Sequence, residues 1–559
     1  MKLYQNRKFL IGVVISSILF TSLMVYRVAF YRGTFKNSVS EKVDWSNQSL
    51  KSDESWMNIF QNFKKIGFSH RILENMGNSY KIHEETLMKI NTMGMVQDIH
   101  VESKSITDMD FAIKEFEFKI TSGSFNFSVK GEIKENILFV QSNSDSASFD
   151  NAKSNNPNSD NPNKKNKPLE LPLENRPYLT SGIIQATLAS GLKQNQEMVL
   201  FVFDPSTLGQ APATVKMEDR EKITLDGKVI NSQRVSLSFK GAKQFAWVDN
   251  EGKVVKEQGL LGITLLKTDR KGAIEGTPIQ DSDDLTNLVS VKSNKTLDEP
   301  SNLKSLTVKI SGLDDLSNFY TALNSGRQVL TESKDKDAES RENGSKSWLL
   351  KIEKEPLEGL PQKITSEDLA RIDNKYKQPD AFIQSDDYRI LSFAFKAISS
   401  DSNSAFSIYS NSSSNLTSSS NNYKSAKFSL ELPLEKVKKL VAWIQTNIKR
   451  QPVVSLPNAL STLENRVGDC NEHAALLAAF CRAVGIPAKI EAGLVYLNGS
   501  FYYHAWNSIF VGKWITVDAL FNQIPADATH IAFSSGSQDM QLDIIGLIGK
   551  VQIEILSSE

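Results

Sequence analysis

The chain has 559 residues, of which 40% are hydrophobic, enough for about three or four globular domains. Its 65 basic and 65 acidic residues give a net charge of zero, so we expect no nucleic-acid partner on electrostatic grounds. The two cysteines, Cys470 and Cys481, lie in one predicted helix, roughly 16 Å apart at about 1.5 Å per residue. Because disulfide-bonded cysteines have Cα atoms within about 7 Å of each other, we expect two free thiols.

An apolar segment near the N-terminus predicts a membrane anchor within residues 1–32. Residues 9–26, FLIGVVISSILFTSLMVY, are an uncharged run of 18 residues, at the lower limit for a spanning helix. No small-x-small cleavage site follows Tyr26, which favours an uncleaved anchor over a signal peptide. Basic residues flank both ends of the run, so the positive-inside rule gives only a weak preference. Since a long domain after a first apolar segment is commonly exported, we expect a single-pass protein with its bulk on the periplasmic or extracellular side, with a cytoplasmic-facing domain as the alternative.

Three polar stretches divide the rest of the chain. Residues 141–168 predict a disordered linker, and residues 331–347 a charged polar loop. In residues 399–422, serine or asparagine occupies 17 of 24 positions, which predicts a surface insert. None of the three stretches carries enough apolar surface to form a core.

Alternating apolar residues in the first half of the chain predict antiparallel strands. The clearest sets are Phe116, Phe118 and Ile120, then Phe125, Phe127 and Val129, and Val235, Leu237 and Phe239. Asp226-Gly227 predicts a hairpin turn, and residues 246–258 predict a strand, a turn and a second strand. We therefore expect two antiparallel β-rich modules, residues 45–140 and 180–310, which either bind a lipid, glycan or protein or shield the rest of the chain.

The C-terminal third changes to a helical pattern. Apolar residues at helical spacing from Ile390 and from Val437 predict two amphipathic helices whose apolar stripes are core. A third helix is predicted in residues 468–489, GDCNEHAALLAAFCRAVGIPAK, where Asp469 and Glu472 form a capping-box pattern and Gly485 ends the helix. Cys470 is then the first helical residue, where the helix dipole favours a nucleophilic thiolate. Cys481 is expected to be a small core residue.

A thiol nucleophile needs a base, and His504 is the preferred candidate among six histidines. Asn498-Gly499 predicts a hairpin turn, and residues 501–521, FYYHAWNSIFVGKWITVDALF, predict the two strands that follow it. A three-residue loop at 510–512 would place His504 opposite Asp518, whose carboxylate could orient the imidazole. His473, one helical turn from Cys470, is the main rival base. His530 is a weaker rival, because no adjacent carboxylate strand is visible beside it.

At these residues the sequence resembles the transglutaminase-like superfamily. The resemblance covers residues 380–535, and the lead-in 458–470 and the tail 523–531 are similar to bacterial members. It implies an α+β, papain-like core with Cys470 as nucleophile, His504 as base and Asp518 as orienting residue. It also implies that the backbone N–H of Cys470 is an oxyanion donor, with Trp506 and Gln523 as site neighbours. The insert at 399–422 departs from the family pattern, and residues 536–559 are expected to add a C-terminal strand.

The implied reaction is acyl transfer through a thioester on a peptide or protein amide, by a cysteine peptidase, amidase or acyltransferase of the cell envelope. Hydrolysis and transamidation remain open, as does the oligomeric state. We expect no required metal and no cofactor, and the acidic run at residues 281–284 is expected to be a solvated turn. The alternative is a non-catalytic envelope binding or assembly factor that uses the β-rich modules and keeps a dormant transglutaminase-like scaffold.

Overall fold

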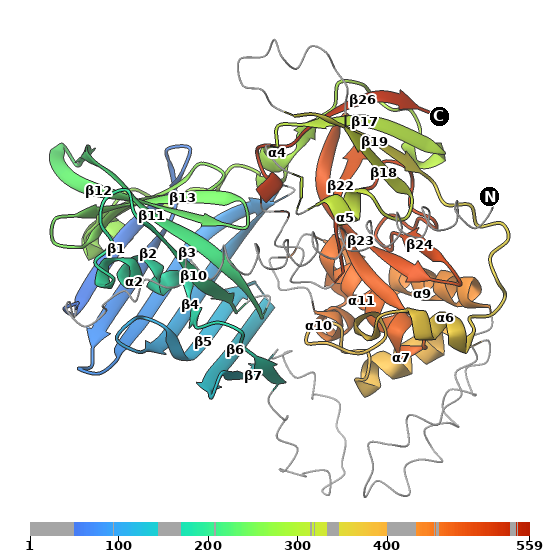
Figure 1. Ribbon diagram of the computed structural model, residues 1–559, viewed down its shortest axis with the longest axis horizontal. Coiled ribbons are helices and arrows are strands. Elements are labelled where there is room, and N and C mark those ends of the chain that lie inside the picture. The colour runs from blue at the N-terminus through green and yellow to red at the C-terminus, as the bar shows by residue number, and fades with distance from the viewer. Residues whose placement is uncertain are drawn as a thin grey trace, which may run out of the picture.

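The fold was taken from a computed structural model, shown in Figure 1. It describes residues 50–559 except 93, 124, 144–168, 206–207, 314–315, 318, 333–345, 400–431, 452, 454–457, 537–543 and 545. The expected anchor, nearly all of the linker and of the polar loop, and nearly all of the serine- and asparagine-rich insert lie outside the described residues. Among the helices that the structure does describe, none is long and apolar enough to cross a membrane.

The first half of the described chain forms one 15-stranded sheet. Its spatial order runs β8 to β1 and then β15 to β9, so the sheet has two arms joined at β1 and β15. The strands are β1 (Asp53–Gln61), β2 (Lys64–Asn75), β3 (Tyr80–Thr92), β4 (Met95–Thr107), β5 (Ile113–Ser122), β6 (Phe125–Lys134), β7 (Ile137–Asn143), β8 (Leu169–Pro172), β9 (Pro177–Tyr178), β10 (Glu197–Asp204), β11 (Gly209–Leu225), β12 (Lys228–Phe239), β13 (Ala242–Asp249), β14 (Val254–Gln258) and β15 (Ile263–Thr268).

The expectation of two separate β-rich modules is wrong, because β1 and β15 pair antiparallel from Trp56↔Thr268 to Gln61↔Ile263. The first strand has one free edge after it forms a hairpin with β2, and β15 satisfies the backbone groups along that edge. The two arms also share a core, since Tyr80 and Ile82 cluster with Val202 and Val215 around α2 (Ile183–Ala189). In Figure 1 this helix lies between the arms.

The second half of the described chain packs helices against a five-stranded sheet with the order β16-β23-β22-β25 and with β24 beside β23. These strands are β16 (Val291–Lys292), β22 (Ala488–Leu497), β23 (Ser500–Phe510), β24 (Trp514–Val517) and β25 (Ile531–Gly536). The helices are α7 (Tyr388–Ile398), α9 (Pro433–Asn447), α10 (Ala459–Asn465) and α11 (Cys470–Ala483). The predicted amphipathic helices are confirmed, and their apolar faces form one core with α11.

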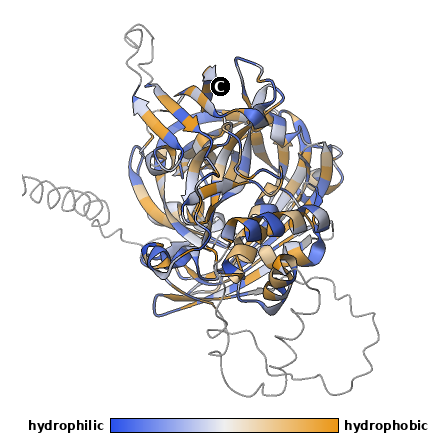
Figure 2. Cartoon of the chain, turned by 90° about the vertical axis from the view of Figure 1, so that its right-hand side faces the viewer, coloured by the Kyte–Doolittle hydropathy of each residue, from blue (hydrophilic) through white to orange (hydrophobic). Residues whose placement is uncertain are grey.

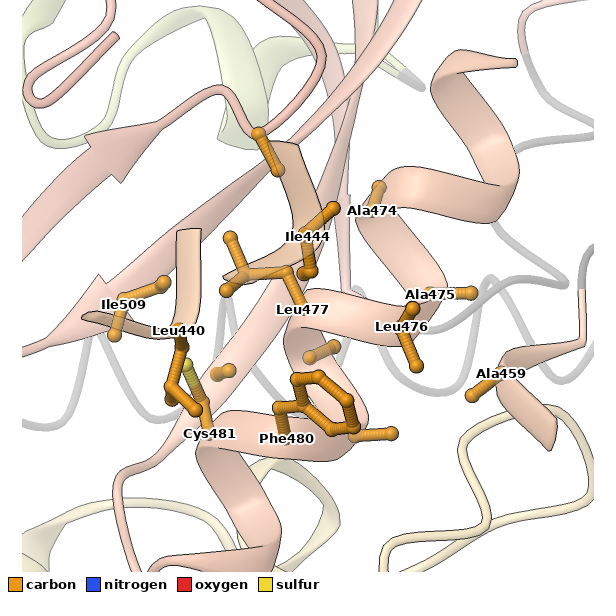
Figure 3. Packing of buried hydrophobic residues seen from close by; sticks show 14 of the residues in the cluster. Leu440, Ile444, Ala459, Ala474, Ala475, Leu476, Leu477, Phe480, Cys481 and Ile509 are labelled. Atoms are coloured by element: carbon orange, nitrogen blue, oxygen red, sulfur yellow. The ribbon is translucent and has the colours of Figure 1, made fainter. Parts of the chain in front are cut away.

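Cys481 lies inside that core and is fully buried. Figure 3 shows its side chain close to Leu440, on the helix turn that also carries Phe480. The prediction that Cys481 is a core residue is therefore confirmed.

A four-stranded sheet with the order β18-β19-β17-β26 completes this half. Its strands are β17 (Ser305–Ser311), β18 (Gln328–Glu332), β19 (Trp348–Glu353) and β26 (Gln552–Ser558). Since β16 and β17 belong to this half of the molecule, the expected module boundary at residue 310 is wrong, and the large sheet ends with β15. The described connections between these elements contain four short helices and one short strand pair. The helices are α3 (Arg270–Ile274), α4 (Leu285–Val289), α5 (Tyr320–Leu323) and α6 (Ser366–Arg371), and the strands are β20 (Lys449–Arg450) and β21 (Val467–Gly468).

The two halves touch where Lys550 Nζ donates a hydrogen bond to the carbonyl oxygen of Gly241, at 2.7 Å. Figure 2 shows hydrophobic and hydrophilic residues alternating along the strands, as the period-two pattern predicted. The predicted hairpin turns at Asp226-Gly227 and Asn498-Gly499 join β11 to β12 and β22 to β23. These local turn signals are thus confirmed.

Candidate active site

Helix α11 begins at Cys470, and the predicted capping box holds its first turn. The Asp469 side chain accepts a hydrogen bond from Asn471 N at 3.0 Å, and Glu472 Oε2 accepts one from Asp469 N at 3.0 Å. These two side chains satisfy amides that have no partner within the helix. The capping box therefore fixes where Cys470 sits relative to the helix end.

The Cys470 thiol lies against the backbone amide of Ala505, the residue that follows His504 on β23. A second contact keeps the helix on this strand: Asn507 Nδ2 donates to the carbonyl oxygen of Ala474, one turn into α11, at 2.9 Å. Since Ala474 lies four residues after Cys470 and Asn507 lies three after His504, the helix and the strand run side by side. The start of α11 is thus brought to the position of His504.

Burial raises the pKa of the Cys470 thiol well above its usual value, and the Asp469 carboxylate raises it further, while the Ala505 amide lowers it. The expectation of a thiolate favoured by the helix dipole is therefore not supported for the free protein. Cys470 is partly exposed, so a reagent or substrate can still reach it. A protonated thiol of this kind needs a base to remove its proton.

His504 and Asp518 are hydrogen-bonded, with His504 Nε2 2.6 Å from Asp518 Oδ2. The other carboxylate oxygen, Asp518 Oδ1, accepts a hydrogen bond from Phe521 N at 2.8 Å. The Phe521 ring stacks on the imidazole with centroids 4.8 Å apart, and Trp506 stacks at 5.9 Å. Because Nε2 donates to Asp518, Nδ1 of a neutral His504 is the nitrogen that can accept a proton.

The strand register differs from the prediction by two residues. Phe510 pairs with Trp514 and Ser508 with Thr516, so the loop is residues 511–513 rather than 510–512. Asp518 stands one residue beyond the end of β24, on the level of Trp506 rather than directly opposite His504. A slip of two residues leaves the side chains on the same face, so the two groups still meet diagonally.

His530, expected above only as a weaker rival base, is a member of the site. Its Nε2 lies 3.0 Å from Asp518 Oδ2, and its Nδ1 lies 3.1 Å from Asp527 Oδ1. No adjacent strand supplies Asp527, which comes instead from the loop before β25. The Asp-x-x-His spacing of residues 527–530 was the available sequence signal.

Both ring nitrogens of His530 face carboxylate oxygens, which only accept hydrogen bonds, so both nitrogens carry protons. Burial alone would lower the pKa of His530, but the hydrogen bonds to Asp518 and Asp527 outweigh it and raise the pKa. The pKa of Asp518 is lowered well below its usual value, because the two histidines outweigh the effect of burial. Asp518 is thus a carboxylate shared by two imidazoles.

The rival base His473 is placed differently. It is fully buried, and its Nδ1 donates to the carbonyl oxygen of Asp469 at 2.7 Å, while its Nε2 has no hydrogen-bond partner among the described residues. Burial lowers its pKa. Within the described part of the chain no carboxylate oxygen is hydrogen-bonded to the His473 ring, whereas Asp518 holds the ring of His504.

The two predicted site neighbours have distinct positions. Trp506 is buried against His504, and its indole Nε1 has no hydrogen-bond partner among the described residues. Gln523 exchanges backbone hydrogen bonds with Asp518 at 2.9 and 3.0 Å, and its Nε2 donates to Asp527 Oδ2 at 2.9 Å. Gln523 therefore holds the backbone of Asp518 and the carboxylate of Asp527.

Arg327, which precedes β18, anchors the loop that carries His530. Its guanidinium donates to the carbonyl oxygens of Ala526 at 2.6 Å and of His530 at 3.2 Å, and it pairs with Glu355 at 3.1 Å. Glu355 in turn accepts a hydrogen bond from Thr516 N on β24 at 2.9 Å. No sequence motif pointed to this pair, because Arg327 and Glu355 flank β18 and β19, far from the motifs around Cys470 and His504.

Among the residues that the structure describes, two clusters of histidine and carboxylate side chains have donor atoms close enough together for a metal ion. His504, Asp518 and His530 offer ligand atoms within 4.8 Å of one another. However, Asp518 Oδ2 already lies at direct hydrogen-bond distance from both imidazoles, so an ion would have to displace both bonds. On β3 and β4, His83, Glu85 and Glu102 also cluster, and Lys104 pairs with Glu102 at 2.5 Å, which opposes a cation there.

Comparison with known proteins places the site within a family. No curated protein matches the sequence. Two solved structures are similar, a "putative cysteine protease" from Cytophaga hutchinsonii and the periplasmic domain of TgpA from Pseudomonas aeruginosa. The first has 18% identity and a TM-score of 0.24 over 46% of this chain and 85% of that chain. The second has 14% identity and a TM-score of 0.22 over 42% and 87%.

The family comparison is more specific than the structural one. Residues 424–519 match the model of the transglutaminase-like superfamily core. Cys470, His504 and Asp518 all lie inside this segment, and His530 lies beyond it. The chain therefore contains a transglutaminase-like domain.

Proposed function

We propose that the protein is a cysteine acyl-transfer enzyme with Cys470 as nucleophile, His504 as base and Asp518 as the residue that orients His504. One observation carries the proposal: α11 presents the thiol against the strand that carries His504, whose ring is held by Asp518. The proposal requires that the three groups, from a helix, a strand and a strand end, meet as nucleophilic catalysis demands.

The first half-reaction forms a thioester. His504 Nδ1 removes the thiol proton as Cys470 Sγ attacks the amide carbonyl carbon, and the new C–S bond produces a tetrahedral oxyanion. The C–N bond then breaks, and the imidazolium gives its proton to the departing amine. The Asp518 carboxylate stabilises the imidazolium between these two steps.

The second half-reaction releases the acyl group. His504 takes a proton from water or from a second amine, which attacks the thioester carbonyl and expels the Cys470 thiolate. The proton returns to sulfur, and the product is a carboxylic acid or a new amide. The Cys470 backbone N–H, at the first position of α11, is the proposed oxyanion donor, because first-turn amides have no partner within the helix.

We also propose that residues 9–26 anchor the protein in a membrane, with the bulk of the chain in the periplasm or outside the cell and a peptide or protein as substrate. The support is the uncharged run of residues 9–26. Protease treatment of intact spheroplasts tests the orientation, since a protected C-terminal domain would contradict it.

The base assignment can be tested without knowing the substrate. Iodoacetamide alkylation at Cys470 is measured at neutral pH in the wild type, His504→Gln and His473→Gln, with Cys481 as the internal buried thiol. We expect the Cys470 rate to fall at least about tenfold in His504→Gln alone. A fall in His473→Gln instead would assign the base to His473.

Activity is then measured with two probes, release of peptides from fluorescent casein and incorporation of dansylcadaverine into casein. Loss of both in Cys470→Ala is expected, and full activity in that variant would contradict the proposal. The alternative, a binding or assembly factor with a dormant core, predicts equal alkylation rates in all three proteins and no turnover.

A further inference from the structure

A cavity of about 770 Å³ lies in the 15-stranded sheet, far in sequence from Cys470. Its floor comes from β1, β2, β3, β14 and β15 at the bend between the two arms, and α2 contributes Gln185 from above. A volume of this size falls within the range of about 300–1,000 Å³ that small-molecule sites occupy.

The floor of the cavity carries three charged side chains. Arg71 on β2 stands directly opposite Glu84 on β3, and Glu257 comes from β14 in the other arm. Burial raises the pKa of Glu257 to about 7, the nearby Glu84 carboxylate raises it as well, and Arg71 lowers it. Two carboxyl groups and one guanidinium therefore lie near one another beside the cavity, and a second cation would relieve the repulsion between the carboxyl groups.

Two residues that line the cavity each have a buried polar atom without a hydrogen-bond partner among the described residues: Oε1 of Gln185, an acceptor, and Nε of Arg71, a donor. Gln185 is 9% exposed. Arg71 uses one terminal nitrogen to donate to the carbonyl oxygen of Ser181, which fixes the guanidinium in place. Buried polar groups are nearly always paired, so an unpaired acceptor and an unpaired donor in one cavity point to a ligand.

The other residues that line the cavity include apolar ones in its interior and charged ones at its mouth. Met57, Leu73 and Leu265 supply an apolar surface. Towards the turn between β13 and β14, Lys253 pairs with Asp53 at 3.4 Å and with Glu251 at 3.6 Å, so these charges are already balanced.

We propose that this cavity binds a short peptide with free termini, its ammonium group held by Glu84, Glu257 and Gln185 and its carboxylate held by Arg71. An ammonium group offers three donors, which matches the three acceptors. The guanidinium offers a donor pair that suits a carboxylate. Two carboxyl groups beside a single arginine disfavour a phosphate or another anion, and three charged floor residues disfavour an acyl chain.

Isothermal titration of the full chain tests this site, with trialanine as the probe and Cys470→Ala as the background so that no peptide is cleaved. We expect trialanine to bind, and both N-acetyl-trialanine and trialanine amide to bind at least about tenfold more weakly. Since the cavity and Cys470 are separate, this result does not depend on whether Cys470 is catalytic. Absence of trialanine binding would overturn the proposal.

Matched variants assign each end of the peptide. Glu257→Gln is expected to weaken trialanine about tenfold but leave N-acetyl-trialanine unchanged, and Arg71→Gln to weaken trialanine but leave trialanine amide unchanged. Gln185→Leu, which keeps the charges, is expected to weaken trialanine severalfold, and its thermal unfolding curve reports whether the sheet is intact. Glu132→Gln on the exposed face of β6 is the control and should change nothing. Equal losses for all three ligands in Glu257→Gln and Arg71→Gln would contradict the assignment.

The pH dependence gives an independent check. The charged groups around Glu257 are Glu84 and Arg71 on the floor and Lys51, Asp53, Glu251 and Lys253 at the mouth. Because an ammonium group prefers an ionised carboxylate, trialanine affinity should rise between pH 5.5 and 7.5, and Glu257→Gln should remove this rise. A rise of equal size in Glu257→Gln would contradict the role of Glu257.

Discussion

His530 Nε2 lies 3.0 Å from Asp518 Oδ2, the same carboxylate oxygen that receives the hydrogen bond of His504. The two imidazoles therefore share one acceptor oxygen, and the bond from His530 fixes the position of the carboxylate that orients His504. His530 is in this sense a positioning residue for the proposed base.

The first prediction concerns this positioning. In His530→Gln the carboxylate of Asp518 loses one of its two imidazole donors, so His504 is held less firmly. We expect kcat/KM to fall by about tenfold, and iodoacetamide alkylation of Cys470 at neutral pH to slow in parallel. His83→Gln on β3 is the control and should leave both rates unchanged. Alkylation at the wild-type rate would limit His530 to packing.

The second prediction concerns Asp518. Asp518→Asn keeps the size of the side chain but presents an amide, which no longer stabilises a protonated His504. We expect kcat to fall by about 10³–10⁴-fold, as expected for loss of the orienting carboxylate of a triad. Near-neutral alkylation of Cys470 by iodoacetamide should slow in parallel. A variant with wild-type turnover would remove Asp518 from the mechanism.

The third prediction links His530 to stability. Its pKa is raised in the folded protein, so the folded state holds the proton more tightly than the unfolded chain. The stabilisation is fully present below the unfolded pKa of about 6.5 and is lost as pH rises through the higher folded pKa. The difference in free energy of unfolding between wild type and His530→Gln, measured with urea, should thus be larger at pH 6 than at pH 9. An equal difference at both values would contradict the charged state of His530.

The fourth prediction concerns Glu257, whose folded pKa of about 7 lies above that of the unfolded chain. A raised acid pKa makes ionisation costly in the folded state, so the carboxyl destabilises the fold above about pH 7 and not below about pH 4. Glu257→Gln should therefore increase the free energy of unfolding by about 1–3 kcal/mol at pH 8 and by much less at pH 4.5. Urea titrations of the two proteins at both pH values provide the measurement.

The fifth prediction concerns Arg327, whose side chain is 5% exposed. Arg327→Ala leaves Glu355 as a buried charge without its partner and frees the carbonyl oxygens of the loop before β25. We expect a loss of about 3–5 kcal/mol in the free energy of unfolding, with lower activity. In Arg327→Ala with Glu355→Gln, part of the stability should return, because the uncompensated charge is gone. If the double variant is no more stable, the loss came from the carbonyl groups alone.

Local signals in the sequence predicted local structure well. The Asp469–Glu472 capping box and the turn at Asn498-Gly499 depend on residues a few positions apart, and both are found as expected. The register between β23 and β24 was wrong by two residues, since a glycine marks a turn but not its first residue. The meeting of His504 with Asp518 survived this error because side chains alternate with a period of two. Their catalytic role, and that of Cys470, stays a prediction.

Contacts between distant segments were beyond the sequence. β1 and β15 pair in space although the other strands of the large sheet lie between them in the sequence. An alternating pattern of apolar residues predicts which face of a strand is buried, but it does not predict which other strand pairs with its edge. The raised pKa of Cys470 depends on how closely the folded chain encloses the sulfur, which the helix position alone does not give. His530 was missed for the same reason, because Asp518 reaches it only through folding.

The four-stranded sheet can be completed only late in the synthesis of the chain. β17 has β19 on one side and β26 on the other, so one of its edges stays open until residues 552–558 have been synthesised. This sheet carries Arg327, which grips the His530 loop. During translation Cys470 is therefore synthesised before the strand that completes the sheet beside Arg327, so the loop of His530 gains its full support only after residues 552–558 have been made.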